Sequence, residues 1–336
     1  MARLGRERER HRPTRIFFAA DIHGSEVTFR KFVAAAAFYD TDALVFGGDL
    51  MGKAFVPIVL DAGGRYRAHF GGEDRVLDRE GLDPFVREIE RTGFYSKVME
   101  RDEYDSADAD PLAQRGLFVD AARERLSAWM AYAEDRLAGS GVRLYLTGGN
   151  DDEPGALEVL DEHPGDVVVA CDGRLVDLDG EHTMITVGWS TPTPWDTPRE
   201  ANEDRMAEMI ETEVGKVADV SRCVFNLHAP PKDTPIDTCL KLEPGSGLGP
   251  GELLKPDRTG GRFHYIGGGS VAVRDAIKRY QPAVALHGHI HESGGRFRLG
   301  RTQCFNPGSE YLQGTLRGWI VALRGGKLTG YQHTSG

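Results

Sequence analysis

Short runs of apolar residues along the chain predict buried β-strands, and polar blocks follow directly after several of them. Residues 16–20 and 43–46 are continuous apolar segments with the length of strands that are buried on both faces. Between them, helical spacing predicts a helix whose buried face is formed by Phe29, Phe32, Val33, Ala36 and Ala37. The pattern indicates a strand–helix–strand unit of an α/β protein, in which ligands gather at the carboxyl ends of the strands.

The same pattern continues in the second half of the chain. Helical spacing over residues 200–218 predicts another helix with one apolar face. Further apolar runs predict strands at 142–146, 167–178, 184–187, 223–227, 283–286, 302–305 and 319–323.

Residues 51–141 differ from the rest, because they are rich in Arg, Asp and Glu and contain no comparable polar block. Apolar residues from Phe118 to Leu137 follow helical spacing, and Gly139 and Gly141 supply a stop signal. We expect a mainly helical insertion or cap within one domain that spans residues 16–336. Two roles are open for it: packing on a face of the sheet, and selection of a substrate.

The composition is that of an ordinary globular protein, with 336 residues, 40% hydrophobic and 28% charged. The formal net charge of -11 argues against a general nucleic-acid or membrane-surface binder, whose binding face is basic. A small anionic substrate is compatible with this charge, because a bound metal can reverse the local sign. No apolar run reaches the roughly 18 residues that span a bilayer.

The N-terminus and the cysteines add two smaller expectations. Residues 1–15 are Arg-rich and lack the apolar core of a secretory signal. We expect a disordered basic arm there, with contact to nucleic acid as the alternative. The four cysteines form no CxxC pair, which argues against a zinc knuckle. Reduced thiols fit a cytoplasmic protein. The oligomeric state is not indicated.

Five polar blocks stand at the ends of predicted strands and together carry carboxylate, imidazole and amide oxygen. These ligand types suit a pair of divalent or mixed-valence metal ions. Each block alone has a plainer explanation, as a capping pair or a structural turn residue. The ordered set favours metal binding. The blocks are 21–24, 47–49, 148–151, His228 and 288–291.

Spacing within the blocks suggests how ligands could converge. Asp21 and His23 alternate along a chain that we expect to be extended, so both side chains would point to the same side. His289 and His291 have the same spacing. Asp49 supplies a carboxylate that could bridge two ions.

With these motifs the chain resembles the calcineurin-like metallophosphoesterase superfamily. The family motifs D-x-H, G-D, G-N-H-D/E, H and G-H-x-H read here as Asp21-Ile22-His23, Gly48-Asp49, Gly149-Asn150-Asp151-Asp152, His228 and Gly288-His289-Ile290-His291. The resemblance runs from about residue 16 to residue 318 and leaves out most of the insertion. It implies a two-sheet α/β sandwich flanked by helices.

The resemblance also implies a role for each motif residue. A first metal ion would be held by Asp21, His23 and His291, a second by Asn150, His228 and His289, and Asp49 would bridge them. The ions would be Mn, Fe, Zn, Co or Ni, with Mn or Fe favoured. A hydroxide that bridges the two metals would attack the phosphate ester, so no protein nucleophile is required.

We therefore expect a metal-dependent hydrolase of phosphate esters that acts on a small phosphodiester or a nucleotide-type substrate. Two alternatives are open. One is a non-catalytic scaffold of the same fold that binds partners. The other is a phosphomonoesterase, a protein phosphatase or a nuclease of the same superfamily.

The chain departs from the family at Asp151, where the motif often has His. A carboxyl group near two cations should have a lowered pKa and be a poor acid. Asp151 would then orient a neighbouring group, and leaving groups that need little protonation would be favoured.

Three further segments lie near the motifs. We expect His287 to be a strand-end residue behind the ligands, and residues 306–309 to close a turn beneath the metal site. The Pro-rich aromatic loop 188–195 is either a rigid surface turn or a wall beside the substrate.

Overall fold

Two six-stranded sheets form the centre of the protein, whose computed structural model describes residues 12–163, 165–243 and 255–336. The first sheet has the order β20-β19-β1-β2-β7-β8, and its strands β1, β2, β7 and β8 are parallel. Its elements are β1 (Thr14–Ala19), β2 (Ala43–Phe46), β7 (Arg143–Leu146), β8 (Val168–Ala170), β19 (Arg317–Arg324) and β20 (Lys327–Ser335).

The second sheet has the order β17-β18-β16-β11-β10-β9. Its four central strands are parallel, and β9 and β17 are antiparallel edge strands. Its elements are β9 (Val176–Asp177), β10 (Thr183–Val187), β11 (Cys223–Leu227), β16 (Val284–Leu286), β17 (Gly295–Leu299) and β18 (Thr302–Asn306).

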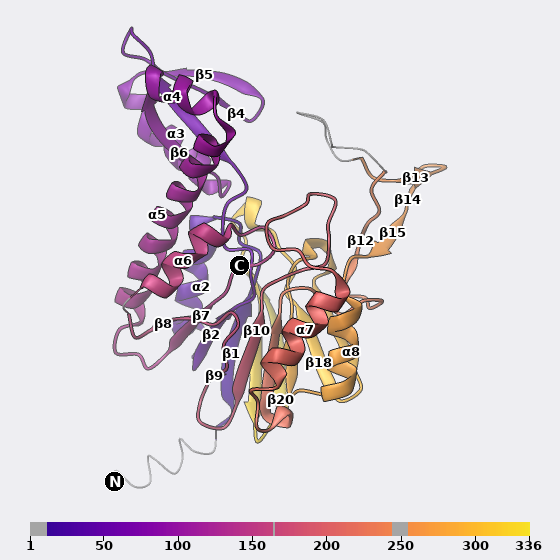
Figure 1. Cartoon of the computed structure of the whole chain (residues 1–336). Helices are drawn as coiled ribbons and strands as arrows, with labels where there is room; N and C mark the ends of the chain where they lie inside the picture. The colour runs from indigo at the N-terminus through magenta and orange to yellow at the C-terminus, as the bar shows by residue number, and fades with distance from the viewer. Residues whose placement is uncertain (1–11, 164, 244–254) are drawn as a thin grey trace.

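Helices cover the outer face of each sheet, so the predicted two-sheet sandwich flanked by helices is confirmed (Figure 1). Strand β1 shows why the layers form: Ile16 and Phe18 are buried between the sheets, and Phe17 and Ala19 face the helices. Helices α2 (Glu26–Phe38), α5 (Pro111–Leu137) and α6 (Pro154–Glu162) cover the first sheet; α7 (Glu203–Val214) and α8 (Val271–Tyr280) cover the second.

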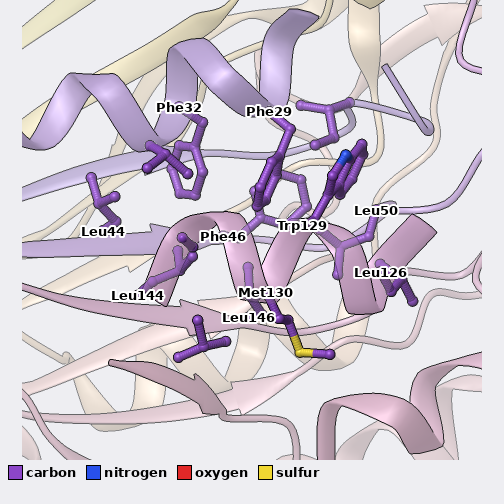
Figure 2. Close-up of a cluster of buried hydrophobic side chains, with 14 of the residues drawn as sticks. Phe29, Phe32, Leu44, Phe46, Leu50, Leu126, Trp129, Met130, Leu144 and Leu146 are labelled. Carbon is purple, nitrogen blue, oxygen red and sulfur yellow. The ribbon is translucent and has the colours of Figure 1, made fainter. Parts of the chain in front are cut away.

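The contact between α2 and α5 shows how the helical layer is held. Phe29 of α2 and Trp129 of α5 stack with ring centroids 4.2 Å apart and planes 5° apart, above Phe46 of the sheet (Figure 2). Such an aromatic pair adds roughly 0.5–1.5 kcal/mol beyond the area that it buries.

Residues 51–141 contain a small sheet that the sequence pattern does not reveal. It has the order β5-β4-β3-β6 and stands apart from the sandwich with α3 and α4 (Figure 1). Its core includes Val56, Ile58 and Phe85. The elements are β3 (Phe55–Leu60), β4 (Tyr66–Phe70), β5 (Glu73–Leu77), α3 (Arg79–Arg91), β6 (Tyr95–Glu100) and α4 (Arg101–Asp108). We call residues 55–108 the accessory unit.

Helix α5 joins the accessory unit to the sandwich, so 51–141 is not one structural unit. From Ala122 to Leu137 its buried side chains belong to the core on the first sheet. The packing role that we considered for the whole stretch therefore applies to α5.

The N-terminal boundary that we expected at residue 15 is too late. Thr14 and Arg15 belong to β1, where Arg15 pairs with Ala322 of β19. Arg12 forms ion pairs with Asp40, at 2.9 Å, and with Asp42. These acidic partners order the end of the basic segment; residues 1–11 lie outside the described part of the chain.

Short elements complete the structure: β12 (Thr238–Leu240) pairs with β15 (Tyr265–Gly267), and β13 (Arg258–Thr259) pairs with β14 (Arg262–Phe263). The 3-10 helices are η1 (Val220–Arg222), η2 (His291–Ser293) and η3 (Tyr311–Gln313). No helix in the described ranges combines the length and the apolar surface that a membrane crossing requires.

Candidate metal centre

The seven predicted ligands come together where the parallel strands of both sheets reach their carboxyl ends. Asp21 follows β1, Asp49 follows β2, Asn150 follows β7, and His228 follows β11. His289 and His291 follow β16. Five of the seven are at most 3% exposed, whereas His289 is half-buried and His291 keeps 29% of its side chain exposed. One edge of the sandwich thus gathers every predicted ligand.

The loops that carry these residues have an unusual backbone. Asp21, His23, Asp49 and His289 have φ values of 57°, 42°, 58° and 70°, in the left-handed region. The extended chain that we expected at Asp21–His23 is therefore wrong, and turns bring the side chains together instead. Non-glycine residues held in this region cost roughly 1–3 kcal/mol each and cluster at functional sites.

Cross-loop hydrogen bonds hold this backbone in place. Asp21 N donates to Gly48 O at 2.9 Å, and His23 N donates to Asp49 O at 3.1 Å. The loops after β1 and β2 therefore run side by side and fix their ligands relative to one another.

A first group of ligand atoms comes from Asp21, His23, Asp49 and His291, and these atoms all lie within 4.8 Å of one another. His23 Nε2 is 3.0 Å from His291 Nε2 and 3.7 Å from Asp49 Oδ2. His291 Nε2 is 3.5 Å from Asp21 Oδ1. Burial holds the pKa of His23 well below its usual value, so its imidazole is neutral and can act as a ligand.

A second group surrounds the amide oxygen of Asn150. Asn150 Oδ1 is 3.0 Å from His228 Nε2 and 2.7 Å from His289 Nδ1. Asp49 Oδ1 is 3.5 Å from the same His228 Nε2. Because Asp49 Oδ2 faces His23, the two oxygens of one carboxylate face the two groups.

The orientation and charge of His228 suit a metal ligand. His228 Nδ1 lies 2.8 Å from Gly47 O, so this nitrogen carries the proton and Nε2 is left to bind a cation. Burial lowers the pKa of His228, but the Asp49 carboxylate more than offsets it and raises the pKa to about 9. A cation bound here would displace the second ring proton.

Glycines beside the ligands allow the loops to approach closely. A Cβ on Gly149 would overlap Asp49 Oδ1, and a Cβ on Gly288 would overlap Asp21 Oδ2. Only glycine fits at these two positions without moving a ligand carboxylate.

Asp151 borders the first group and forms an ion pair that the sequence does not predict. Its Oδ2 lies 2.6 Å from Lys53 Nζ and 3.7 Å from His23 Nδ1. Burial, together with the Asp49 carboxylate, raises the pKa of Asp151, whereas Lys53 opposes this shift. Burial lowers the pKa of Lys53, but Asp151 more than offsets it, so the ammonium group stays charged. The lowered pKa that we expected for Asp151 refers to a site that holds two cations, and it stays a prediction.

Two polar residues to which the sequence analysis gave no role hold the ligand loops. Asp152 is fully buried and accepts backbone N–H bonds from Leu50 at 3.0 Å, Met51 at 2.7 Å and Gly149 at 2.6 Å. Thr197 Oγ1 and Asp151 Oδ1 accept bonds of 3.0 Å and 3.1 Å from Asn150 Nδ2, which turns Oδ1 of that amide towards the two histidines. Asp152 is the last residue of the motif at 149–152, which was a usable signal, whereas no sequence pattern points to Thr197.

Residues 306–309 close a turn against the site, as we predicted. Ser309 Oγ donates to Asp21 O at 2.6 Å, and Asn306 Nδ2 donates to Ile290 O at 2.9 Å. His287 is buried behind the ligands with Nδ1 2.8 Å from Leu227 O, and burial lowers its pKa to about 4. In the loop 188–195, Trp195 is 62% exposed, which favours the surface-turn alternative for its tip.

No protein-family model and no curated protein matches the chain. A solved structure that is 17% identical matches 96% of this chain and 98% of its own, with a TM-score of 0.55. The crystal structure of a second protein, from Thermus thermophilus, is 14% identical over 96% of this chain and 98% of its own, with a TM-score of 0.50. At these identities the likeness shows the fold alone.

A dimetal phosphatase from Danio rerio is 9% identical over 96% of this chain and 98% of its own, but its TM-score of 0.42 is too low to carry weight. The comparisons therefore confirm the two-sheet fold, and the cluster of aspartate and histidine side chains lies at the edge of that fold.

Proposed function

We propose that the protein is a metal-dependent hydrolase of phosphate esters with a centre for two metal ions. The observation that carries this proposal is the pair of ligand groups that share Asp49. One oxygen of this carboxylate lies 3.7 Å from His23 Nε2, and the other lies 3.5 Å from His228 Nε2. A carboxylate placed between two sets of nitrogen and oxygen donors suits two neighbouring cations.

Each residue of the two groups has a part in this proposal. The first ion would be held by Asp21, His23 and His291, the second by Asn150, His228 and His289, and both by Asp49. Nitrogen and oxygen donors without thiolate suit Mn or Fe, and also Zn, Co or Ni. When bound, two such ions supply positive charge to a phosphate group and increase the acidity of water.

The substrate that we propose is a small phosphodiester or a nucleotide-type molecule. The acidic chain, with a net charge of -11, disfavours long polyanions, whose binding requires an extended basic surface. Since Asp151 stands where the family often has His, we propose a leaving group that departs with little protonation, such as an aryl oxide or a phosphoanhydride.

Metal analysis combined with a substrate panel tests this function. Protein loaded with Mn or Fe should bind two ions and hydrolyse an aryl phosphodiester faster than the matching monoester. Asp49→Asn should lose both ions and the turnover. His69 is exposed and lies outside the centre, so His69→Gln should keep the two ions and the turnover. Wild-type protein that binds no metal and turns over no phosphoester with added Mn would favour the scaffold alternative. A preference for monoesters would redirect the proposal to a phosphomonoesterase.

A further inference from the structure

Lys53 places an ammonium group at the border of the candidate metal centre. Its Nζ lies 2.6 Å from Asp151 Oδ2, and this same oxygen lies 3.7 Å from His23 Nδ1 of the first ligand group. The side chain of Lys53 is 43% exposed. The ammonium group therefore reaches both the centre and the solvent from which a substrate arrives.

The charge of the centre indicates what an ammonium group at this position would do. Two divalent ions would bring four positive charges, and Asp21 and Asp49 already offset two of them. Asp151 adds a third carboxylate where the family often has a neutral or cationic imidazole. This extra negative charge weakens the attraction for a phosphate group, and the ammonium group of Lys53 restores it.

The backbone that leads to Lys53 is fixed at three successive residues. Asp152 accepts the N–H bonds of Leu50 and Met51, and Tyr95 Oη accepts that of Gly52 at 2.8 Å. Tyr95 is the first residue of β6 and is buried. The accessory unit thus contributes a side chain that holds the segment immediately before Lys53.

Close backbone packing adds to this restraint. A Cβ on Gly52 would overlap Gly93 O, as would one on Gly24, so only glycines let the loop at Gly93 lie against the ligand loops. The loop before β6 therefore limits how far the Lys53 segment can move.

We propose that Lys53 binds a phosphate oxygen of the substrate, and that Asp151 and Tyr95 are positioning residues for it. An ammonium group has three donors, so the bond to Asp151 leaves donors for a phosphate oxygen. The inference rests on the proposed function, because it places the phosphate group at the metal centre.

The test measures the binding of inorganic phosphate to metal-loaded protein by calorimetry, together with metal content. Lys53→Met should weaken phosphate binding about 10- to 100-fold, the loss expected for one charge-assisted hydrogen bond, with metal content unchanged. Lys53→Arg should retain most of the affinity. Without Lys53 the Asp151 carboxylate only repels phosphate, so adding Asp151→Asn to Lys53→Met should weaken phosphate binding no further and should recover part of it.

Lys97→Met is the matched control, because Lys97 pairs with Glu103 at 2.8 Å within the accessory unit. If Lys53→Met does not fold, Lys53→Gln is measured in its place. If Lys53→Met has wild-type metal content and binds phosphate within twofold of the wild-type affinity, the role of Lys53 is overturned and the proposed function is not. Wild-type protein that binds no metal overturns the proposed function and this inference with it.

Discussion

Replacing Thr197 with valine should weaken one metal position and spare the other. Thr197 Oγ1 accepts the bond from Asn150 Nδ2, at 3.0 Å, that turns the amide oxygen towards His228 and His289. Valine keeps the shape of the side chain but removes this acceptor together with the hydroxyl group that donates to Glu200 Oε1 at 2.6 Å. Asn150 is 3% exposed, so its amide N–H cannot turn to bulk water without moving the oxygen as well.

Asn150 Nδ2 also donates to Asp151 Oδ1 at 3.1 Å, so Thr197→Val removes one of its two bonds. Losing the acceptor costs about 1–2 kcal/mol, because a buried N–H loses its partner. If the lost bond makes the metal-binding orientation of the amide less stable by this amount, the dissociation constant of the second ion rises about 5- to 30-fold. The first ion, which we assign to Asp21, His23 and His291, should keep its affinity.

Competition with a coloured chelator measures the two dissociation constants. Thr212→Val is the control, because Thr212 Oγ1 also forms a hydrogen bond, of 2.8 Å, but lies on α7 outside the centre. Two ions bound by Thr197→Val with wild-type affinity would refute the role of Thr197. Equal weakening of both ions would refute the division of ligands into two groups.

Three further predictions concern charge, core and backbone. The pKa of His228, raised from 6.5 to about 9 in the folded protein, contributes stability that is fully present below pH 6.5 and lost towards pH 9. The melting temperature of chelator-treated protein should therefore fall over this range, and His228→Gln should flatten the fall. Trp129→Ala removes the ring that stacks on Phe29 and should lower the unfolding free energy by about 3–5 kcal/mol in urea titrations; a loss below about 1 kcal/mol would contradict the packing. Gly149→Ala should displace Asp49 and reduce metal content, whereas Gly155→Ala, whose added Cβ would meet its nearest neighbour at 3.9 Å, should not.

The sequence predicts the sandwich and the ligand set because both depend on short-range patterns. Continuous apolar runs indicate strands that are buried on both faces, as at 43–46, and parallel strands bring their carboxyl ends to one edge. Asp49 follows β2 of the first sheet and His228 follows β11 of the second, and they lie together because the parallel strands of both sheets end at the same edge of the sandwich.

Elements that depend on tertiary contacts escape the sequence pattern. In β5 the residues Glu73, Asp74 and Arg75 carry no apolar side chain, so this strand has no apolar run to reveal it. The left-handed backbone at Asp21 and His23 depends on bonds to the loop after β2. Lys53 reaches Asp151 only because that loop is fixed, so no spacing rule connects the two residues.

The packing of Gly93 against Gly24 and Gly52 affects how this protein could be modified. A unit with its own core, such as residues 55–108, would ordinarily be a natural place for deletion or for exchange with another sequence. Here a shortened loop would remove the Tyr95 acceptor and expose the backbone of two ligand loops. Protein engineering of the accessory unit should therefore preserve 93–95 and change the distal strands β4 and β5 instead.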